Sequence, residues 1–220
     1  MSPRRLLEMV QSFRAGAPLG DVAMLKLDAL SEPPRDVTER LEALRGYAPR
    51  HDLATLRRLP EGTLGRRYLG FLDRNRIEPL QVSEAMQKRF EGRPFPLRYT
   101  ATHDLHHVLT GFDTTLAGEI GVLAFDVGQR AAPVGILTLY LLAVFYTLLS
   151  PFQGRAIWKN VRAGLTLGRG ADLVLAEPLE DAFDVPLREI RARLHIADPL
   201  ATGVVRGKGS ILGALLYARR

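Results

Sequence analysis

The stretch THDLHHVLTGFDTTLAGE, residues 102–119, decides the predicted fold because it contains two helical segments with a break between them. His103 and His107 stand four positions apart, so on a helix they share one face, with Cβ atoms roughly 6 Å apart. Gly111 favours a helix end, since glycine readily adopts the left-handed conformation that follows a last helical turn. Without this break, Glu119 would lie more than about 20 Å along the axis from His103. The sequence therefore predicts a helix hairpin that brings Glu119 back to the two histidines.

The rest of the chain has the same helical spacing of apolar residues. Its 220 residues are 46% hydrophobic, and runs of β-branched residues of the kind that form sheets are scarce. A chain of this length and composition builds an ordinary core and differs from disordered and fibrous proteins. We therefore predict a mainly α-helical fold, in which residues 1–220 form a single helical domain that contains the hairpin.

Local signals predict where other helices begin and end. A capping box at residues 36–39 predicts a helix that runs to Arg45. Asp52 is the expected cap of a helix over residues 53–59, which Pro60 would end. A last helix is expected over residues 185–195.

Two prolines before the histidines predict a loop. The residue that precedes a proline is disfavoured in a helix, so Pro94 and Pro96 are expected to lie outside the histidine helix. The expected cap of that helix is then Thr100 or Thr102. The candidate caps of the following helix are Asp113, Thr114 and Thr115.

Charge and cysteine content limit the partners and ligands. Thirty Lys and Arg residues against 24 Asp and Glu give a net charge of +6 and a pI near 10.0. This balance favours an anionic partner, such as a phospholipid surface, a phosphorylated ligand or nucleic acid. The basic residues form no long block and accompany no nucleic-acid motif, so we expect a membrane surface and no nucleic acid. The absence of cysteine excludes thiolate metal ligands and leaves imidazole and carboxylate.

One long apolar stretch stands out. No charged residue occurs between Arg130 and Arg155, and residues 136–149 are long enough for a membrane-spanning helix to be considered. Pro133 and the interior Thr and Tyr residues weaken that interpretation. We predict instead a helix buried on all sides in the core, with lining of an isoprenoid channel as the alternative. The tail, residues 197–220, mixes basic and apolar residues and is expected to be amphipathic.

The histidine cluster predicts a metal site. Three histidines fall within residues 103–107 next to a carboxylate, and burying them without partners would cost roughly a few kcal/mol each. Histidines at i and i+4 can instead converge on one ion, about 2 Å from each ring nitrogen. The predicted ligands are His103, Asp104, His107 and Glu119. This mixture of imidazoles and carboxylates suits a divalent metal, Zn²⁺ first and also Fe²⁺ or Mn²⁺, and suits Mg²⁺ less.

Two further polar residues have open roles at this stage. His106 points about 60° away from His103 on a helix, so we expect it to support the ligands or to face a substrate. Asp126 either orients a ligand or is a solvated helix residue. The His-Asp dipeptide also occurs in HD phosphohydrolases, but their further ligands come from separated helices, and no suitable His and Asp pair stands out here.

The motif His103-Asp104-x-x-His107, followed after eleven residues by Glu119, resembles the signature of the coenzyme Q (ubiquinone) biosynthesis family of the Coq4 type. Other similar stretches follow the family order and extend the resemblance over roughly residues 53–196. They are residues 59–65, Gly118-Glu119-Ile120, Trp158 with Gly164, and residues 186–191.

This resemblance implies a helical, homodimeric, peripheral membrane protein that binds a metal and a long prenyl chain. Its location would be cytoplasmic, on the inner membrane if the chain is bacterial. In that family the metal site is linked to removal of the C1 carboxyl group of a polyprenylated hydroxybenzoate, and the protein scaffolds other quinone-biosynthesis proteins. Asp104 is the candidate proton donor to the ring carbon. The alternatives are a non-catalytic lipid-binding scaffold and an HD-type metal-dependent phosphohydrolase.

Overall fold

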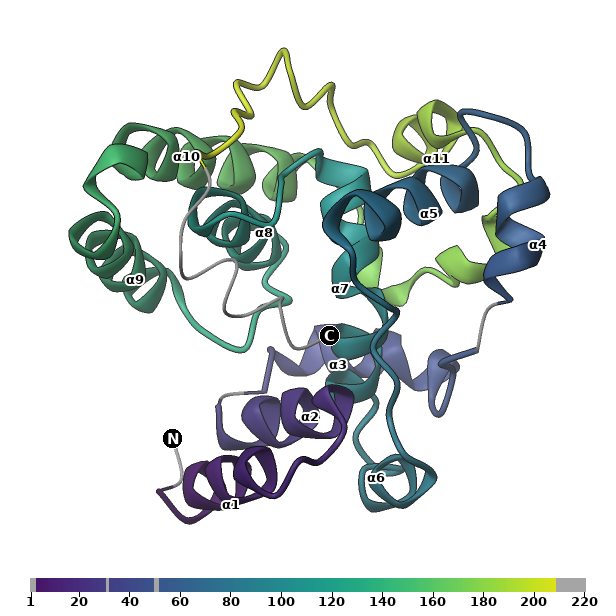
Figure 1. Cartoon of the computed structure of the whole chain (residues 1–220), viewed down its shortest axis with the longest axis vertical. Helices are drawn as coiled ribbons and strands as arrows, with labels where there is room; N and C mark the ends of the chain where they lie inside the picture. Colours follow the sequence, from purple (N-terminus) through teal and green to yellow (C-terminus); the bar gives the residue numbers. More distant parts are fainter. Residues whose placement is uncertain (1–2, 31, 50–51, 209–220) are drawn as a thin grey trace.

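The computed structural model describes residues 3–30, 32–49 and 52–208 as an assembly of helices (Figure 1). Its α-helices are α1 (Pro3–Arg14), α2 (Leu19–Ala29), α3 (Arg35–Leu41), α4 (Leu53–Arg58), α5 (Leu64–Asn75), α6 (Glu84–Arg89), α7 (Pro94–Thr110), α8 (Leu116–Gly128), α9 (Ile136–Leu149), α10 (Gly154–Gly170) and α11 (Leu187–Arg193). Short 3₁₀ turns occur at Glu42–Leu44, Pro151–Gln153, Val174–Ala176 and Leu179–Ala182. Over these ranges the chain forms no strand, only an isolated bridge between Thr63 and Pro186. The prediction of a mainly α-helical fold is confirmed.

α7 occupies the centre of the molecule, and the other helices surround it in three groups (Figure 1). α4, α5 and α11 lie on one side of α7, and α8, α9 and α10 lie on the other. α1, α2, α3 and α6 gather near the beginning of α7. The largest cluster of buried apolar side chains includes residues of α5, α7, α8, α10 and α11, so the histidine part of α7 lies within the main core.

The proline segment before the histidines is the first turn of α7 rather than a loop. Pro94 occupies the first helical position, where the missing N–H costs no hydrogen bond and the fixed φ suits a helix. Pro96 also lies in the first turn, whose N–H groups have no partner within the helix. The predicted loop and the predicted cap at Thr100 or Thr102 are therefore wrong. The longer helix adds Tyr99 one turn before the histidines.

Glycines bring α8 and α10 into close contact. A Cβ atom at Gly164 would lie 2.3 Å from the carbonyl oxygen of Gly121, and one at Gly168 would lie 2.1 Å from that of Phe125. Larger residues at these two α10 positions would therefore force the helices apart. This close packing holds α8, and with it Glu119, in a fixed place beside the core.

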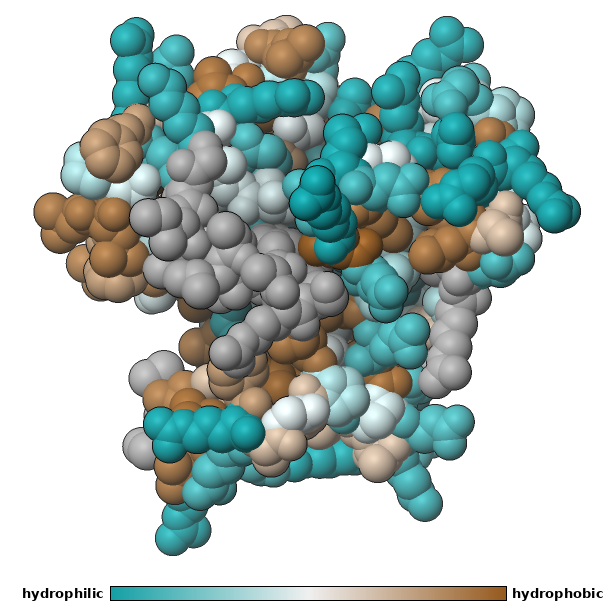
Figure 2. Space-filling model, in the orientation of Figure 1, coloured by the Kyte–Doolittle hydropathy of each residue, from teal (hydrophilic) through white to brown (hydrophobic). Residues whose placement is uncertain are grey.

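α9 is not buried on all sides, so that prediction is wrong. Only Leu139 and Ala143 of this helix are fully buried, in an apolar cluster that also contains residues of α8 and α10. Leu148 is 73% exposed, and seven more apolar side chains of α9 are exposed. A hydrophobic patch at the left edge of Figure 2 coincides with the place of α9 in Figure 1. The helix is apolar all round, but neighbouring helices cover only one side of it.

The membrane-spanning alternative also lacks support. None of the helices within the described ranges combines the length and the apolar character that crossing a bilayer requires. α9 itself spans 14 residues, whereas a spanning helix needs about 20.

Some helix boundaries differ from the predictions. α3 begins at Arg35 after Pro34 without a side-chain cap, and a 3₁₀ turn replaces its expected last turn, so the capping box at residues 36–39 is wrong. Asp52 does cap α4, by accepting a hydrogen bond from a backbone N–H of its first turn. α11 is shorter than predicted at both ends. Most of the expected amphipathic tail, residues 209–220, lies outside the described residues.

Candidate metal centre

α7 and α8 carry the three side chains that converge. His103 and His107 lie on α7, and Glu119 lies in the first turn of α8. Gly111 ends α7 in the left-handed conformation, with a φ of 76°. Thr115 begins α8 by accepting a hydrogen bond from a backbone N–H of the first turn. The predicted helix end at Gly111 is confirmed, and Thr115 is the one of the three candidate caps that begins α8.

The carboxylate of Glu119 lies between the two imidazoles. Its Oε2 is 3.5 Å from Nε2 of His103, and its Oε1 is 3.6 Å from Nε2 of His107. One ligand atom from each of the three residues lies within 4.8 Å of the other two. The side chain of His107 is fully buried, whereas those of His103 and Glu119 are each 21% exposed. The centre is therefore closed on the His107 side and reachable past the other two residues.

The hydrogen bonds of His107 prepare it to bind a metal. Its Nδ1 lies 3.1 Å from the backbone carbonyl oxygen of Phe112. A carbonyl only accepts, so Nδ1 must carry the proton, and a neutral ring then presents a lone pair at Nε2. That Nε2 atom is buried and makes no hydrogen bond. A buried nitrogen without a hydrogen bond, close to a carboxylate and a second imidazole, fits a divalent ion such as Zn²⁺.

Mutual electrostatics favour the charged forms of Glu119 and His107 when no ion is bound. Burial opposes ionisation of Glu119, but the neighbouring His107 and His103 hold the pKa of its carboxyl group well below the usual range. Burial likewise disfavours the protonated form of His107, yet the charge of Glu119 raises the pKa of His107 overall. A divalent cation would replace the proton of His107 as the positive partner of Glu119.

A buried network lies behind the triad. Nδ1 of His106 is 2.8 Å from Oδ1 of Asp126, and the hydroxyl of Tyr99 donates to Oδ2 of Asp126 at 2.7 Å. Asp126 is completely buried, so its interpretation as a solvated residue is wrong. The ring of Tyr99 stacks against that of His103 at 6.2 Å between centroids. Asp126 therefore connects to the centre through Tyr99, and His106 is not one of the three converging residues.

Comparison with known proteins agrees with this arrangement. A family model described as "Coenzyme Q (ubiquinone) biosynthesis protein Coq4" matches residues 47–199. The chain belongs to the Coq4 family. The match includes all of α5, α7, α8 and α10, together with the three converging residues.

Two curated Coq4 relatives, both described as mitochondrial ubiquinone biosynthesis proteins, show the extent of the similarity. The homolog of Danio rerio is 32% identical over 202 residues, which cover 89% of this chain and 72% of the relative. The human homolog is 34% identical over 151 residues, which cover 67% of this chain and 56% of the relative. This Coq4-family chain thus aligns with little more than half of the human protein.

A solved structure also resembles this Coq4-family chain. It is a candidate ubiquinone biosynthesis protein from Nostoc punctiforme, with a TM-score of 0.60 and 24% identity, and the match covers 88% of this chain and 97% of the other. At this identity the likeness supports the shared fold alone. The helical architecture is therefore a property that both proteins have.

Asp104 occupies a different position from the three converging residues of this Coq4-family site. It is buried on α7, and its charge contributes to the raised pKa of His107. It does not belong to the group of ligand atoms that lie within 4.8 Å of one another. Its roles as a fourth ligand and as a proton donor stay predictions.

Sequence reasoning missed the residues that hold the ligands in place. Tyr99 stands four residues before His103, so the i, i+4 rule would have placed the two on one face had α7 been extended to Pro94. Phe71 of α5 stacks on His107 at 5.3 Å between ring centroids. No local signal links Phe71 to His107, because the contact depends on how α5 packs against α7.

Proposed function

We propose that this protein is a metal-dependent enzyme of ubiquinone biosynthesis that removes the C1 carboxyl group of a polyprenylated hydroxybenzoate. The observation that carries the proposal is the buried Nε2 of His107, which makes no hydrogen bond and lies 3.6 Å from Oε1 of Glu119, with His103 beside them. An ion held by these three residues would keep a coordination position for substrate, as catalytic zinc ions do. Zn²⁺ is the first candidate, and Fe²⁺, Mn²⁺ and Mg²⁺ are the others.

In this proposal each residue has a defined task. His103, His107 and Glu119 hold the ion, which when bound polarises the substrate carboxylate. The bond between the carboxyl carbon and C1 breaks, CO₂ leaves, and the electron pair stays on the ring carbon. Asp104 takes up a proton from water and passes it to that carbon, which returns Asp104 to its carboxylate form, and the hydroxide that remains combines with CO₂ as bicarbonate. Tyr99 keeps the ring of His103 in place throughout.

The exposed face of α9 supports a membrane-surface location for the reaction. An apolar helix with one uncovered side is typical of interfacial attachment, and basic residues beside it favour anionic lipids. Phe152 follows α9 and is 85% exposed, and the exposed residues Arg155 and Lys159 come next in the chain. We infer that this surface lies on the membrane from which a prenyl chain enters.

The inner side of α9 links this surface to the centre. Tyr146 is largely buried, and its pKa is raised by burial and by the nearby charge of Glu119. Tyr146 packs against the apolar cluster of α8, α9 and α10. A prenyl chain that followed α9 inward would therefore bring its aromatic head group towards Glu119.

The same surface supports the second candidate, a non-catalytic scaffold that gathers other quinone-biosynthesis proteins as a homodimer on the membrane. In that case the ion would stabilise the fold or hold a lipid head group. Both candidates predict metal binding, so metal content alone does not separate them.

The variants His103→Ala and Glu119→Ala test the proposal. Metal content of the purified proteins and quinone intermediates are measured in cells that lack their own copy of the gene. We expect loss of metal, accumulation of the carboxylated precursor, and an unchanged helical circular dichroism spectrum. His195→Ala is the matched control, because His195 is exposed and pairs with Asp172 on the surface. Folded, metal-free variants that restore normal quinone levels would refute the catalytic proposal, and nucleotide hydrolysis would favour a phosphohydrolase.

A further inference from the structure

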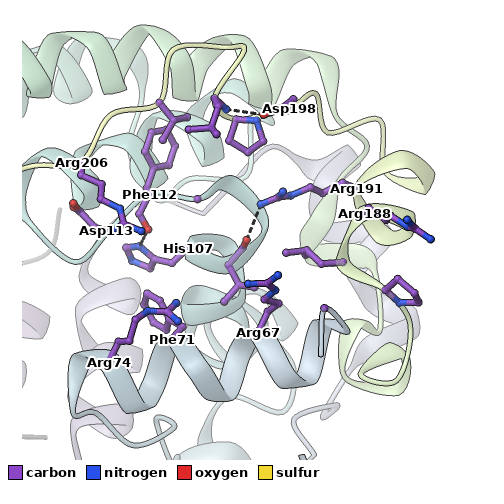
Figure 3. Close-up of a pocket in the computed structure, with 18 of the residues that line it drawn as sticks. Arg67, Phe71, Arg74, His107, Phe112, Asp113, Arg188, Arg191, Asp198 and Arg206 are labelled. Atoms are coloured by element: carbon purple, nitrogen blue, oxygen red, sulfur yellow. Dashed lines mark hydrogen bonds between the residues drawn. The ribbon is translucent and has the colours of Figure 1, made fainter. Parts of the chain in front are cut away.

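A second, larger space lies next to the metal centre. A pocket of about 1010 Å³ is lined by residues of α5, the end of α7 and the region of α11 and its following segment (Figure 3). His107 forms part of its wall, whereas His103 and Glu119 do not line it. The pocket is therefore distinct from the space in which the three ligand atoms meet.

The pocket wall carries an excess of positive charge. Its charged residues are Arg67, Arg74, Arg188, Arg191, Arg206, Glu61, Asp113 and Asp198. The three carboxylates already have partners. Glu61 pairs with Arg66 at 2.9 Å, outside the pocket lining, and Asp113 and Asp198 each accept a backbone N–H hydrogen bond of 2.8 Å. Asp198 also lies near Arg191, whose pKa its charge raises, so the excess positive charge rests on the other four arginines.

Two of these arginines flank an aromatic side chain on one face of α5. Arg67, Phe71 and Arg74 stand at positions i, i+4 and i+7, so they form a single stripe along the helix. In Figure 3, Arg67 and Arg74 rise from α5 on the side of Phe71 and His107. A stripe of this kind normally packs into a core, but only its central residue does so here.

The guanidinium groups of this stripe are not neutralised. Within the described ranges the side chains of Arg67, Arg74 and Arg206 make no hydrogen bond or ion pair. Burial lowers the pKa of Arg191; the charge of Asp198 opposes this shift, and the like charge of nearby Arg67 adds to it. Like charges gathered round a concave wall attract an anion from solution.

Arg191 has a structural task that separates it from the others. Its Nε donates to the carbonyl of Leu109 at 2.8 Å, and its Nη2 donates to that of Val108 at 3.1 Å. These carbonyls belong to the last turn of α7, the negative end of its helix dipole. The charge of Arg191 offsets the negative end of the α7 dipole. The positive charge of the remaining arginines therefore stays available to a ligand.

We propose that this pocket binds an organic phosphate. Arg67, Arg74 and Arg206 hold the dianionic phosphate group, and Phe71 and Phe112 contact the organic part. Three unpaired arginines match a doubly charged phosphate better than a single carboxylate, since a planar guanidinium donates two parallel hydrogen bonds to phosphate oxygens. The volume accommodates a ligand far larger than the phosphate group itself.

Isothermal titration of the purified full chain with phenyl phosphate tests the proposal. We expect saturable binding that weakens about tenfold to a hundredfold in Arg67→Gln/Arg74→Gln, because each charge-assisted hydrogen bond is lost. The matched control is Arg162→Gln/Arg169→Gln. These two arginines have the same i, i+7 spacing on α10, are exposed, and remove the same charge. The control variant should bind phenyl phosphate as the unaltered protein does.

Three further arms define the ligand. Benzoate should bind more weakly than phenyl phosphate, and equal binding would overturn the assignment of a phosphate. Vesicles that contain phosphatidic acid identify a lipid head group as the source if they bind through Arg67 and Arg74 more tightly than phenyl phosphate does. Glu119→Ala should keep phosphate binding even without metal, which separates this pocket from the metal centre. Equal loss in both double variants, or no saturable binding, would overturn the proposal.

Discussion

α7 and α9 are opposites in sequence and in surroundings. α7 carries an arginine, an aspartate and three histidines, and most of it is buried. α9 carries no charged residue, and most of its apolar side chains face outward. Ordinary folding would favour the reverse, since burial of polar groups costs free energy and burial of apolar groups contributes it. In α7, a bound metal ion would compensate for the buried polar groups. In α9, a membrane surface would cover the exposed apolar side chains.

The partners inside the protein explain how α7 tolerates its burial. Arg98 is completely buried, but its Nη1 and Nη2 donate to the carboxylate of Glu180 at 2.7 and 3.3 Å, and backbone carbonyls accept its other hydrogen bonds. His106 has Asp126 in the same way. Nε2 of His106 and Nε2 of His107 both lack a hydrogen bond in the part of the chain that the structure describes, but Nε2 of His107 lies 3.6 Å from Oε1 of Glu119. No other helix in the described part of the chain covers the exposed leucines of α9 in this way.

His107→Ala should give the largest effect on the α7 side. It removes the buried ligand of the centre, so we expect metal affinity to fall by more than about a hundredfold, beyond the loss seen when a supporting partner is removed. His106→Ala removes a neighbouring imidazole that is not among the converging residues and should cost about tenfold to a hundredfold. Chelator competition measures both. Equal losses would mean that His106 is itself a ligand.

Asp126→Ala should cause the next largest effect, this time on stability. The substitution leaves the ring of His106 and the hydroxyl of Tyr99 buried without their shared acceptor, which should lower the free energy of unfolding by about 3 kcal/mol. Urea denaturation measures it. Asp172→Ala is the control, because its histidine pair is exposed and should contribute less than about 1 kcal/mol. Similar values for both would show that burial of the network adds nothing.

Leu141→Glu/Leu148→Glu should remove membrane binding by α9 without unfolding the protein. Both residues are exposed, so stability should change little, while binding to anionic vesicles should fall by about tenfold or more. Leu139→Ala should lower stability and leave vesicle binding unchanged. It opens a cavity in the core, which should cost about 2–5 kcal/mol of stability. Vesicle flotation and thermal unfolding separate the two. Unchanged flotation of the glutamate variant would remove the membrane role of α9.

The sequence predicted the parts of this comparison that depend on local chemistry. The end of α7 follows from the preference of glycine for a left-handed residue, and the start of α8 follows from a threonine that can accept a backbone N–H. Together, the end of α7 and the start of α8 determine where His103, His107 and Glu119 lie. The predicted start of α7 is wrong because prolines suit the first turn of a helix as well as a loop.

The surroundings of each helix could not be predicted in the same way. Hydropathy shows that α9 disfavours water, but only packing shows that α8 and α10 cover one side of it. The burial of Asp126 likewise depends on how α8 turns towards α7. The unpaired arginines of α5 depend on where α11 and its following segment lie, so no spacing rule reveals their pocket.

Lowering the pH should weaken metal binding at the α7 centre and leave vesicle binding by α9 unchanged. This is the smallest of the expected effects. Binding of a metal needs the neutral form of His107, whose pKa is raised in the folded protein. As pH falls through that raised pKa, protons compete with the ion, and metal affinity should drop by up to about tenfold per pH unit. As pH rises above it, the affinity should level off.

α9 contains no group that titrates in this range, so the share of vesicle binding due to α9 should stay constant over the same pH window. Chelator competition and vesicle flotation at matched ionic strength measure the two responses. A parallel loss of both on acidification would mean that the two helices act as one unit, with the metal centre controlling attachment to the membrane.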